Sequence, residues 1–321
     1  MALATTYKKS AFHLALTQGL PKPHHVLASD DLTPAEIRQI LDLAHELKAQ
    51  RKLGLSIEPK EGLSLGMIFE KQSLRTRVSF ELAFQELGGH AVYLTKGDID
   101  MGNRESIADT AQVLSNWCTL IVARLYSHEH IEELAAHSSV PVVNALTDQE
   151  HPCQALADLM TLEEEFGKDK LKLAYIGDGN NVANSFAVTA AKLGHEVNIC
   201  TPPGYEAGAC TYCYANIHHG YSPHEAVLGA DAVYTDVWVS MGQEDEEELR
   251  MSRFAKYQVN ADLMKQAKKS AVFLHCLPAR RGLEVTEEVI DGPQSMIFEQ
   301  SDNRLHTQKA LMMLLLEKGA V

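Results

Sequence analysis

The chain alternates short apolar segments of strand length with longer segments of helical periodicity, and the pattern runs through two successive series. The strand-like segments are residues 66–69, 91–94, 120–124 and 140–144 in the first series, and 172–176, 196–200, 232–236 and 271–275 in the second. Strands that alternate with helices predict βαβ units and a parallel sheet. The predicted fold class is therefore α/β, with two doubly wound parallel-sheet domains joined by interdomain helices.

Helix signals place the elements between these strands. Thr33 followed by Pro34 and Glu36 has the pattern of a capping box with proline at the first helical position. We predict further helices over residues 78–87, 106–117 and 152–166, and an apolar C-terminal helix over 307–316. The helix near residues 148–166 separates the two halves, so we expect domains 1–148 and 149–303.

Composition excludes several classes of function. The chain has 321 residues and a net charge of −14, which argues against nucleic-acid or anionic-membrane partners because phosphate groups repel such a surface. No stretch approaches the ~18 apolar residues of a membrane span. Six scattered cysteines without a secretory signal indicate reduced thiols and a cytoplasmic location. Residues 1–23 contain no arginine, so we do not expect a cleaved transit peptide.

The segment SLRTR, residues 73–77, follows the first apolar strand and opens a helix. Exposed backbone N–H groups and the positive helix end favour an anion there, and an arginine guanidinium adds a bidentate donor. The alternative is an ordinary helix cap with surface arginines. A phosphate-binding site is the functional interpretation of this segment.

Two further segments carry candidate catalytic groups. His151 and Gln154 lie three residues apart at a helix start, where both side chains can point at one carbonyl oxygen; a structural histidine is the alternative. His275-Cys276-Leu277-Pro278 follows a strand, at the edge where open α/β sheets bind ligands. A buried, inert cysteine is the alternative for Cys276.

The second series contains two candidate amine or carboxylate sites. Gly177-Asp178-Gly179 lacks the third glycine of a dinucleotide fingerprint, and Asn180 and Asn181 after it are suited to hold an amino-acid carboxylate or amine. Asp236, just past a strand, can pair with a cationic amine or can simply form a turn.

Cys210, Cys213, His218 and His219 have metal-like composition, but their spacing is shorter than that of a zinc finger. We interpret this stretch as a helical surface segment and expect no metal.

Taken together, these motifs resemble the aspartate/ornithine transcarbamylase superfamily, and within it the ornithine carbamoyltransferases. The family's S-T-R-T-R, H-P-x-Q and H-C-L-P motifs match residues 73–77, 151–154 and 275–278, and its D-x-x-x-S-M-G stretch matches residues 236–242. The similarity runs from about residue 25 to the C-terminus. It implies transfer of the carbamoyl group of carbamoyl phosphate to the side-chain amine of L-ornithine, giving L-citrulline and phosphate, without a cofactor.

The resemblance also assigns residues. Carbamoyl phosphate would be held in the first domain, with Cys276, Leu277 and Arg304 closing the site from the second; the ligands are Ser73, Leu74, Arg75, Thr76, Arg124, His151, Gln154, Cys276, Leu277 and Arg304. Ornithine would be held by Asn181, Asp236, Ser240 and Met241 in the second domain. The catalytic groups would be Arg124, His151, Cys276 and Asp236.

The family further implies a homotrimer or an assembly of trimers, with residues 304–321 packing back on the first domain. Leu74 replaces the family's usual threonine, and Asp100 stands where many relatives have glutamine or histidine. These departures keep two alternatives open. One is a relative that carbamoylates another amine, such as putrescine or an acylated ornithine, and the other is a catalytically inactive paralogue.

Overall fold

The first sheet contains four parallel strands in the order β2-β1-β3-β4. Its strands are β1 (Ser64–Phe69), β2 (His90–Thr95), β3 (Leu120–Arg124) and β4 (Val142–Leu146). The second sheet contains five parallel strands in the order β7-β6-β5-β8-β9. Its strands are β5 (Lys172–Ile176), β6 (Glu196–Cys200), β7 (Ile217–Gly220), β8 (Ala232–Tyr234) and β9 (Val272–Leu274). The predicted α/β class with two parallel sheets is confirmed.

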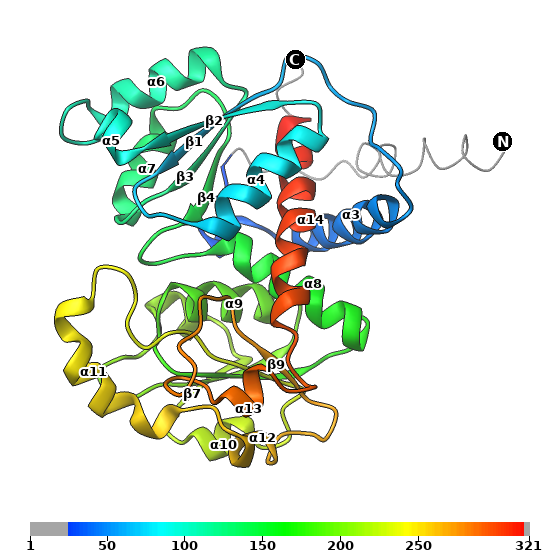
Figure 1. Cartoon of the computed structure of the whole chain (residues 1–321), viewed down its shortest axis with the longest axis vertical. Helices are drawn as coiled ribbons and strands as arrows, with labels where there is room; N and C mark the ends of the chain where they lie inside the picture. The colour runs from blue at the N-terminus through cyan, green and yellow to red at the C-terminus, as the bar shows by residue number, and fades with distance from the viewer. Residues whose placement is uncertain (1–24, 318–321) are drawn as a thin grey trace, which may run out of the picture. The chain divides into compact units, whose positions relative to one another are not determined.

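This computed structural model describes residues 25–317, and the chain divides into two compact units (Figure 1). Unit 1 comprises the residues up to Leu156 together with those from Arg304 onward, and unit 2 comprises Ala157–Asn303. The long helices α8 (Pro152–Phe166) and α14 (Ile297–Leu316) each contain one of the two boundaries. The N-terminal stretch considered for a transit peptide lies outside the described residues.

Helices cover both faces of the first sheet (Figure 1). The helical elements of this unit are η1 (Ser29–Asp31), α3 (Pro34–Lys52), α4 (Leu74–Glu86), α5 (Lys96–Ile99), α6 (Ile107–Trp117) and α7 (His128–Ala136). One core cluster joins β1 and β3 to α6 and α7 through buried side chains such as Ile121, Ala111 and Leu134. Figure 1 shows α4 and α14 on the opposite side of this sheet.

Successive residues of β5 and β8 point to opposite faces of the unit 2 sheet. Its helical elements are α9 (Asn181–Lys192), η2 (Ala209–Cys213), α10 (Pro223–Val227), η3 (Glu244–Glu246), α11 (Glu247–Phe254), η4 (Ala255–Tyr257), α12 (Ala261–Met264) and α13 (Glu287–Ile290). Ala174 and Val233 pack into a cluster with residues of α10, α12 and α13. The next residue of β8, Tyr234, instead places its ring centroid 4.9 Å from that of Phe186 in α9. This alternation is the period-two pattern of a strand covered on both faces.

Local signals account for several element boundaries. Thr33 accepts the N–H of Glu36, and the Glu36 carboxylate accepts the N–H of Thr33, so the capping box is confirmed. The helix predicted over 78–87 includes the SLRTR segment that was expected to open it. It begins at Leu74, where the Ser73 hydroxyl caps it by accepting the N–H of Thr76. The C-terminal helix begins ten residues before the predicted 307, at Ile297.

Tertiary contacts explain that longer helix. Gln300 donates to the Asp158 carboxylate at 2.6 Å, and Asn303 donates to the Thr161 hydroxyl at 2.9 Å, all within unit 2. Beyond Arg304, nearly every side chain up to Leu315 is buried. No helix in the described part of the chain combines the length and the apolar character needed to cross a bilayer.

Gly89 provides a stability test of the unit 1 core. A Cβ at this position would lie 2.2 Å from Cε1 of the buried Phe84 ring and 3.0 Å from Cβ of Leu63. We expect Gly89→Ala to lower the free energy of unfolding by about 1–3 kcal/mol, the usual cost of overpacking. The control is Gly97→Ala, whose new Cβ would meet only the Thr95 hydroxyl at 3.6 Å. Equal urea-denaturation midpoints for the two variants would contradict this packing.

Candidate active site

The N-terminus of α4 forms the start of a cationic cluster in unit 1. Leu74 and Arg75 lie in its first turn, where backbone N–H groups have no intrahelical acceptor and the helix dipole is positive. The register of the sheet pairs Phe69 at the end of β1 with Arg124 at the end of β3. The helix start and the Arg124 side chain therefore meet at the carboxyl edge of the sheet, beside the point where the strand order reverses.

Buried hydrogen bonds join the cluster to α8 and α14. Arg124 and Arg304 both donate to the hydroxyl of Thr76, at 3.5 and 3.2 Å. Arg304 also donates to the Gln154 side-chain oxygen at 2.6 Å. All four side chains are at most 7% exposed, so the guanidinium groups are fixed in a medium that strengthens their attraction for an anion.

His151 lies in the same cluster and is buried. Burial, together with the neighbouring Arg304, Arg124 and Arg75, holds the pKa of its imidazole well below the usual range. The ring is therefore neutral at pH 7, with one N–H available as a donor and one nitrogen as an acceptor.

The structure thus brings Ser73, Thr76, Arg124, His151, Gln154 and Arg304 together in unit 1, with Arg75 close enough to affect His151. Arg304 was expected to close the site from the second domain, but it belongs to unit 1. The Leu74 side chain is 74% exposed, and its backbone N–H belongs to the first turn of α4. The sequence interpretation did not single out Lys71, which is buried two residues before the cap with its ammonium 4.3 Å from the centre of the Tyr126 ring.

A second polar cluster lies at the carboxyl edge of the unit 2 sheet, and its centre is Asp236. The Cys276 thiol donates to one carboxylate oxygen at 3.1 Å, and the Asn180 amide donates to the other at 2.8 Å. Register explains the meeting: Tyr234 pairs with Leu274, so the residues two positions further along, Asp236 and Cys276, are also neighbours.

The Asn180 side chain contacts Asp236, and the ligand role expected of Asn181 stays a prediction. The Asn180 side-chain oxygen caps α9 by accepting the N–H groups of Val182 and Ala183, and it accepts the Tyr175 hydroxyl at 3.1 Å. Asn181 is the first residue of the helix. An asparagine immediately before a helical segment is the usual cap signal, so the sequence contained the clue to Asn180.

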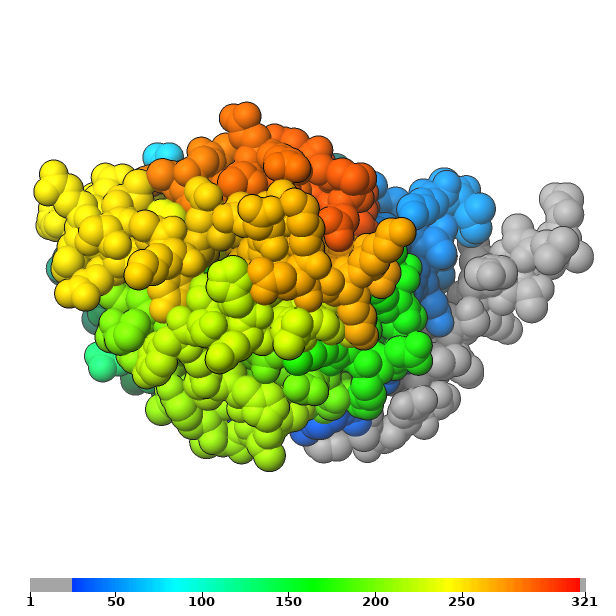
Figure 2. Space-filling view, turned by 90° about the horizontal axis from the view of Figure 1, so that it is seen from below, coloured from blue at the N-terminus to red at the C-terminus, as the bar shows by residue number. Residues whose placement is uncertain are grey.

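The loop with Ser240 and Met241 follows Asp236. Ser240 donates its backbone N–H to the Gln243 side chain, and Met241 is 46% exposed. Arg250 of α11 anchors the loop by donating to the Trp238 carbonyl at 3.1 Å and to the Asp178 carboxylate at 3.0 Å. Burial raises the pKa of Asp178 to about 6, although Arg250 acts in the opposite direction. The segment with η3 and α11 is the yellow surface at the edge of the view in Figure 2.

The residues predicted to form a helical surface segment are only partly helical. Cys210 and Cys213 lie on the 3-10 helix η2, but His218 and His219 belong to the edge strand β7. That prediction was wrong for the histidines because pairing with β6, which propensity does not reveal, sets their conformation. The His219 ring stacks on Tyr212 with centroids 3.8 Å apart.

The metal-like group among the described residues is instead Asp236, His275 and Cys276, whose donor atoms lie within 4.8 Å of one another. Both imidazole nitrogens of His275 already face protein groups: Nδ1 accepts the N–H of Leu277, and Nε2 lies 3.2 Å from the Glu284 carboxylate. A metal would have to displace one of these contacts. The expectation of a site without metal stays a prediction.

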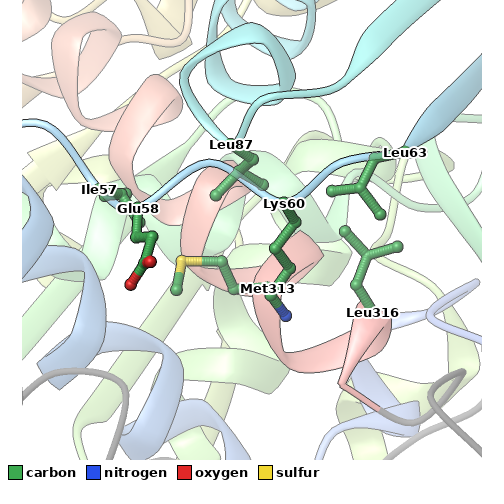
Figure 3. Close-up of a pocket in the computed structure, with 7 residues that line it drawn as sticks. All are labelled: Ile57, Glu58, Lys60, Leu63, Leu87, Met313 and Leu316. Atoms are coloured by element: carbon green, nitrogen blue, oxygen red, sulfur yellow. The ribbon is translucent and has the colours of Figure 1, made fainter.

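Figure 3 shows a hollow in unit 1 between residues 57–63, the end of α4 and the end of α14. Its lining is mainly aliphatic: Ile57, Glu58, Lys60, Leu63, Leu87, Met313 and Leu316. None of the predicted site residues lines it. The hollow therefore has no evident part in the chemistry of the cationic cluster.

Comparison with known proteins agrees with this geometry. The family model for the aspartate/ornithine carbamoyltransferase carbamoyl-P binding domain matches residues 24–164, and the model for the Asp/Orn binding domain matches residues 169–315. The chain belongs to the aspartate/ornithine carbamoyltransferase family.

Members of this family resemble the chain over nearly its whole length. The ornithine carbamoyltransferase of Caldicellulosiruptor saccharolyticus is 50% identical over 301 residues, which cover 91% of this chain and 98% of that protein. The solved ornithine carbamoyltransferase of Pyrococcus furiosus has a TM-score of 0.90 and 46% identity, covering 94% of this chain and 100% of that one. The structure from Thermus thermophilus has a TM-score of 0.85 at the same identity, covering 92% and 100%.

The neutral state of His151 predicts a specific pH dependence of stability. The unfolded chain takes up a proton near the ordinary histidine pKa of 6.5, whereas the folded site does so only well below it. Stability from this group is therefore present above about pH 6.5 and is lost below it, with a slope of about 1.4 kcal/mol per pH unit. We expect His151→Gln to remove that slope from urea-unfolding curves measured between about pH 7.5 and about pH 5.5. If the free energy of unfolding depends on pH equally in the original protein and in His151→Gln, the buried imidazole of His151 is not held neutral.

Proposed function

We propose that the protein is an ornithine carbamoyltransferase, which transfers the carbamoyl group of carbamoyl phosphate to the side-chain amine of L-ornithine. The cationic cluster at the start of α4 is the observation that carries the proposal. It combines a helix N-terminus, the side chains of Arg75, Arg124 and Arg304, and the neutral imidazole of His151. The chain as a whole carries a net charge of −14. The similarity to known ornithine carbamoyltransferases supports ornithine as the second substrate.

Unit 1 would bind carbamoyl phosphate. The N-terminal N–H groups of α4, with the Ser73, Arg75 and Thr76 side chains, would hold the phosphate. The remaining ligands would be Leu74 through its N–H, Arg124, His151, Gln154 and Arg304. Arg124 and His151, with the Thr76 hydroxyl, would stabilise the oxyanion that forms on the carbamoyl oxygen, since preorganised donors act most strongly where charge develops.

Unit 2 would bind ornithine through Asn181, Asp236, Ser240 and Met241, and would supply Cys276 and Leu277. The neutral side-chain amine attacks the carbamoyl carbon, and the tetrahedral intermediate collapses with loss of phosphate. The amine carries a surplus proton once the new C–N bond has formed. Asp236 and Cys276, joined by the 3.1 Å hydrogen bond, would orient the amine and help accept that proton.

A matched pair of arginine variants tests the phosphate site. Arg75 forms no ion pair with any residue that the structure describes, whereas Arg77, two residues along, pairs with Glu81 and covers the Tyr93 ring at 3.9 Å. We expect Arg75→Ala to lower the rate of citrulline formation more than ~100-fold, the contribution of one preorganised donor. Arg77→Ala should stay within ~10-fold of the original rate. Equal losses in both variants would remove the proposed phosphate site.

The acceptor amine is tested by a substrate panel. Ornithine carries an α-carboxylate that putrescine lacks, so a site that holds this carboxylate disfavours putrescine, whose binding would leave the polar groups of the site unpaired. We expect citrulline from ornithine and less than ~1% of that rate with putrescine. Faster reaction with putrescine or an acylated ornithine would identify the alternative carbamoyltransferase. Binding of carbamoyl phosphate without turnover of any amine would identify an inactive paralogue.

We also propose a homotrimer, or an assembly of trimers, in the cytoplasm. An exposed apolar row on α4, formed by Leu74, Val78 and Leu82, supports association because surface rows of this kind tend to be covered. The six cysteines are free thiols, which fits a reducing compartment. Asp100, which stands where many relatives have glutamine or histidine, accepts a hydrogen bond from the Asn103 side chain at 3.3 Å.

A further inference from the structure

His275 is fully buried in unit 2, and both of its ring nitrogens are in use. Nδ1 accepts the backbone N–H of Leu277 at 2.9 Å, and Nε2 lies 3.2 Å from a carboxylate oxygen of Glu284. An accepting Nδ1 carries no proton, so the proton of the neutral ring is on Nε2 and is donated to Glu284. The carboxylate therefore selects the tautomer that can hold Leu277.

Glu284 is itself completely buried and is fixed by a further bond, since the same carboxylate oxygen accepts the N–H of Arg280 at 2.6 Å. On the other side, the backbone N–H of His275 donates to the Gln300 side chain at 2.9 Å, and Gln300 donates to Asp158 at 2.6 Å. A continuous hydrogen-bonded row thus holds the histidine from both ends. Such a row has little freedom to rearrange.

The segment held in this way is Cys276-Leu277. Leu277 adopts a φ of +59°, a left-handed conformation that a leucine rarely occupies without support from its surroundings. The bond from its N–H to His275 closes the turn around Cys276. The Cys276 thiol is thereby directed at Asp236, with the sulfur 3.1 Å from the carboxylate oxygen.

We propose that His275 and Glu284 form a positioning pair, which selects the backbone turn that places Cys276 and Leu277 for carbamoyl transfer. The pair acts through that turn and touches no substrate. The proposal rests on the proposed roles of Cys276 and Leu277 in the reaction. It assigns to the histidine of the H-C-L-P segment a role as hydrogen-bond acceptor for a backbone amide.

Two substitutions of the same residue separate this role from simple packing. In His275→Asn the amide oxygen falls near the place of Nδ1 and can accept the Leu277 N–H. In His275→Gln the amide falls near the place of Nε2, so it can still meet Glu284 but leaves that N–H without an acceptor. Both variants remove the imidazole ring and should lose similar stability, measured as Tm.

We expect His275→Gln to lower kcat for citrulline formation by ~100-fold, the usual effect of displacing catalytic groups by about 1 Å. His275→Asn should retain kcat within ~10-fold of the original enzyme. The KM for carbamoyl phosphate should change little in either variant, because most of its proposed ligands are in unit 1. Equal kcat values for the two variants, whether both low or both unchanged, would overturn the proposal.

A second readout does not require catalysis. Alkylation of Cys276 by iodoacetamide, followed by peptide mass mapping, should be faster in His275→Gln than in His275→Asn, with exposed Cys213 as the internal reference. The milder substitution Glu284→Gln should lower kcat and speed the alkylation of Cys276, as His275→Gln does, but by smaller factors. Unchanged alkylation in all three variants would overturn the positioning pair. If the original chain forms no citrulline, the proposed function fails, and alkylation alone decides the pair.

Discussion

Both candidate sites depend on one constraint, the reversal of strand order beside the first strand of each parallel sheet. Connections leave β1 toward β2 on one side and reach β3 on the other, and β5 has the same relation to β6 and β8. The loops that follow β1 and β3 therefore lead away from each other, and so do the loops that follow β5 and β8 in the second sheet. Neither loop of a pair covers the other. Polar groups gather at these two places because the edge leaves backbone N–H groups and side chains without strand partners.

The two units use this common topology for opposite charges. In unit 1, the positive end of α4 adds to the buried cations Arg124 and Arg304, which makes an anion the natural ligand. In unit 2, Asn180 caps α9 and turns its amide toward Asp236, so a carboxylate is held where an amine can be bound. The acidic chain thus keeps a local positive site, in which Arg124 and Arg304 are buried and held by hydrogen bonds.

Rigid support surrounds both clusters. Arg250 holds the base of the loop after Asp236, and the His275–Glu284 pair holds the turn at Cys276. Transfer between two bound substrates is sensitive to small displacements of the catalytic groups, since orientation supplies much of the rate. Several of the buried polar residues in unit 2 are therefore understood as supports for neighbouring groups, rather than as ligands of a substrate.

The sequence by itself determined the α/β class, most strand positions and the motif residues, because strand periodicity, caps and motif chemistry are local properties. It did not predict the strand β7, the early start of α14, the contact of Asn180 with Asp236 or the hydrogen bonds of Arg304 to Thr76 and Gln154. Those features arise from pairing and packing between residues far apart in the chain, such as Arg304 with Thr76. Only the tertiary structure decided them, since sheet register and helix packing select which side chains meet, and neither is encoded within a short segment.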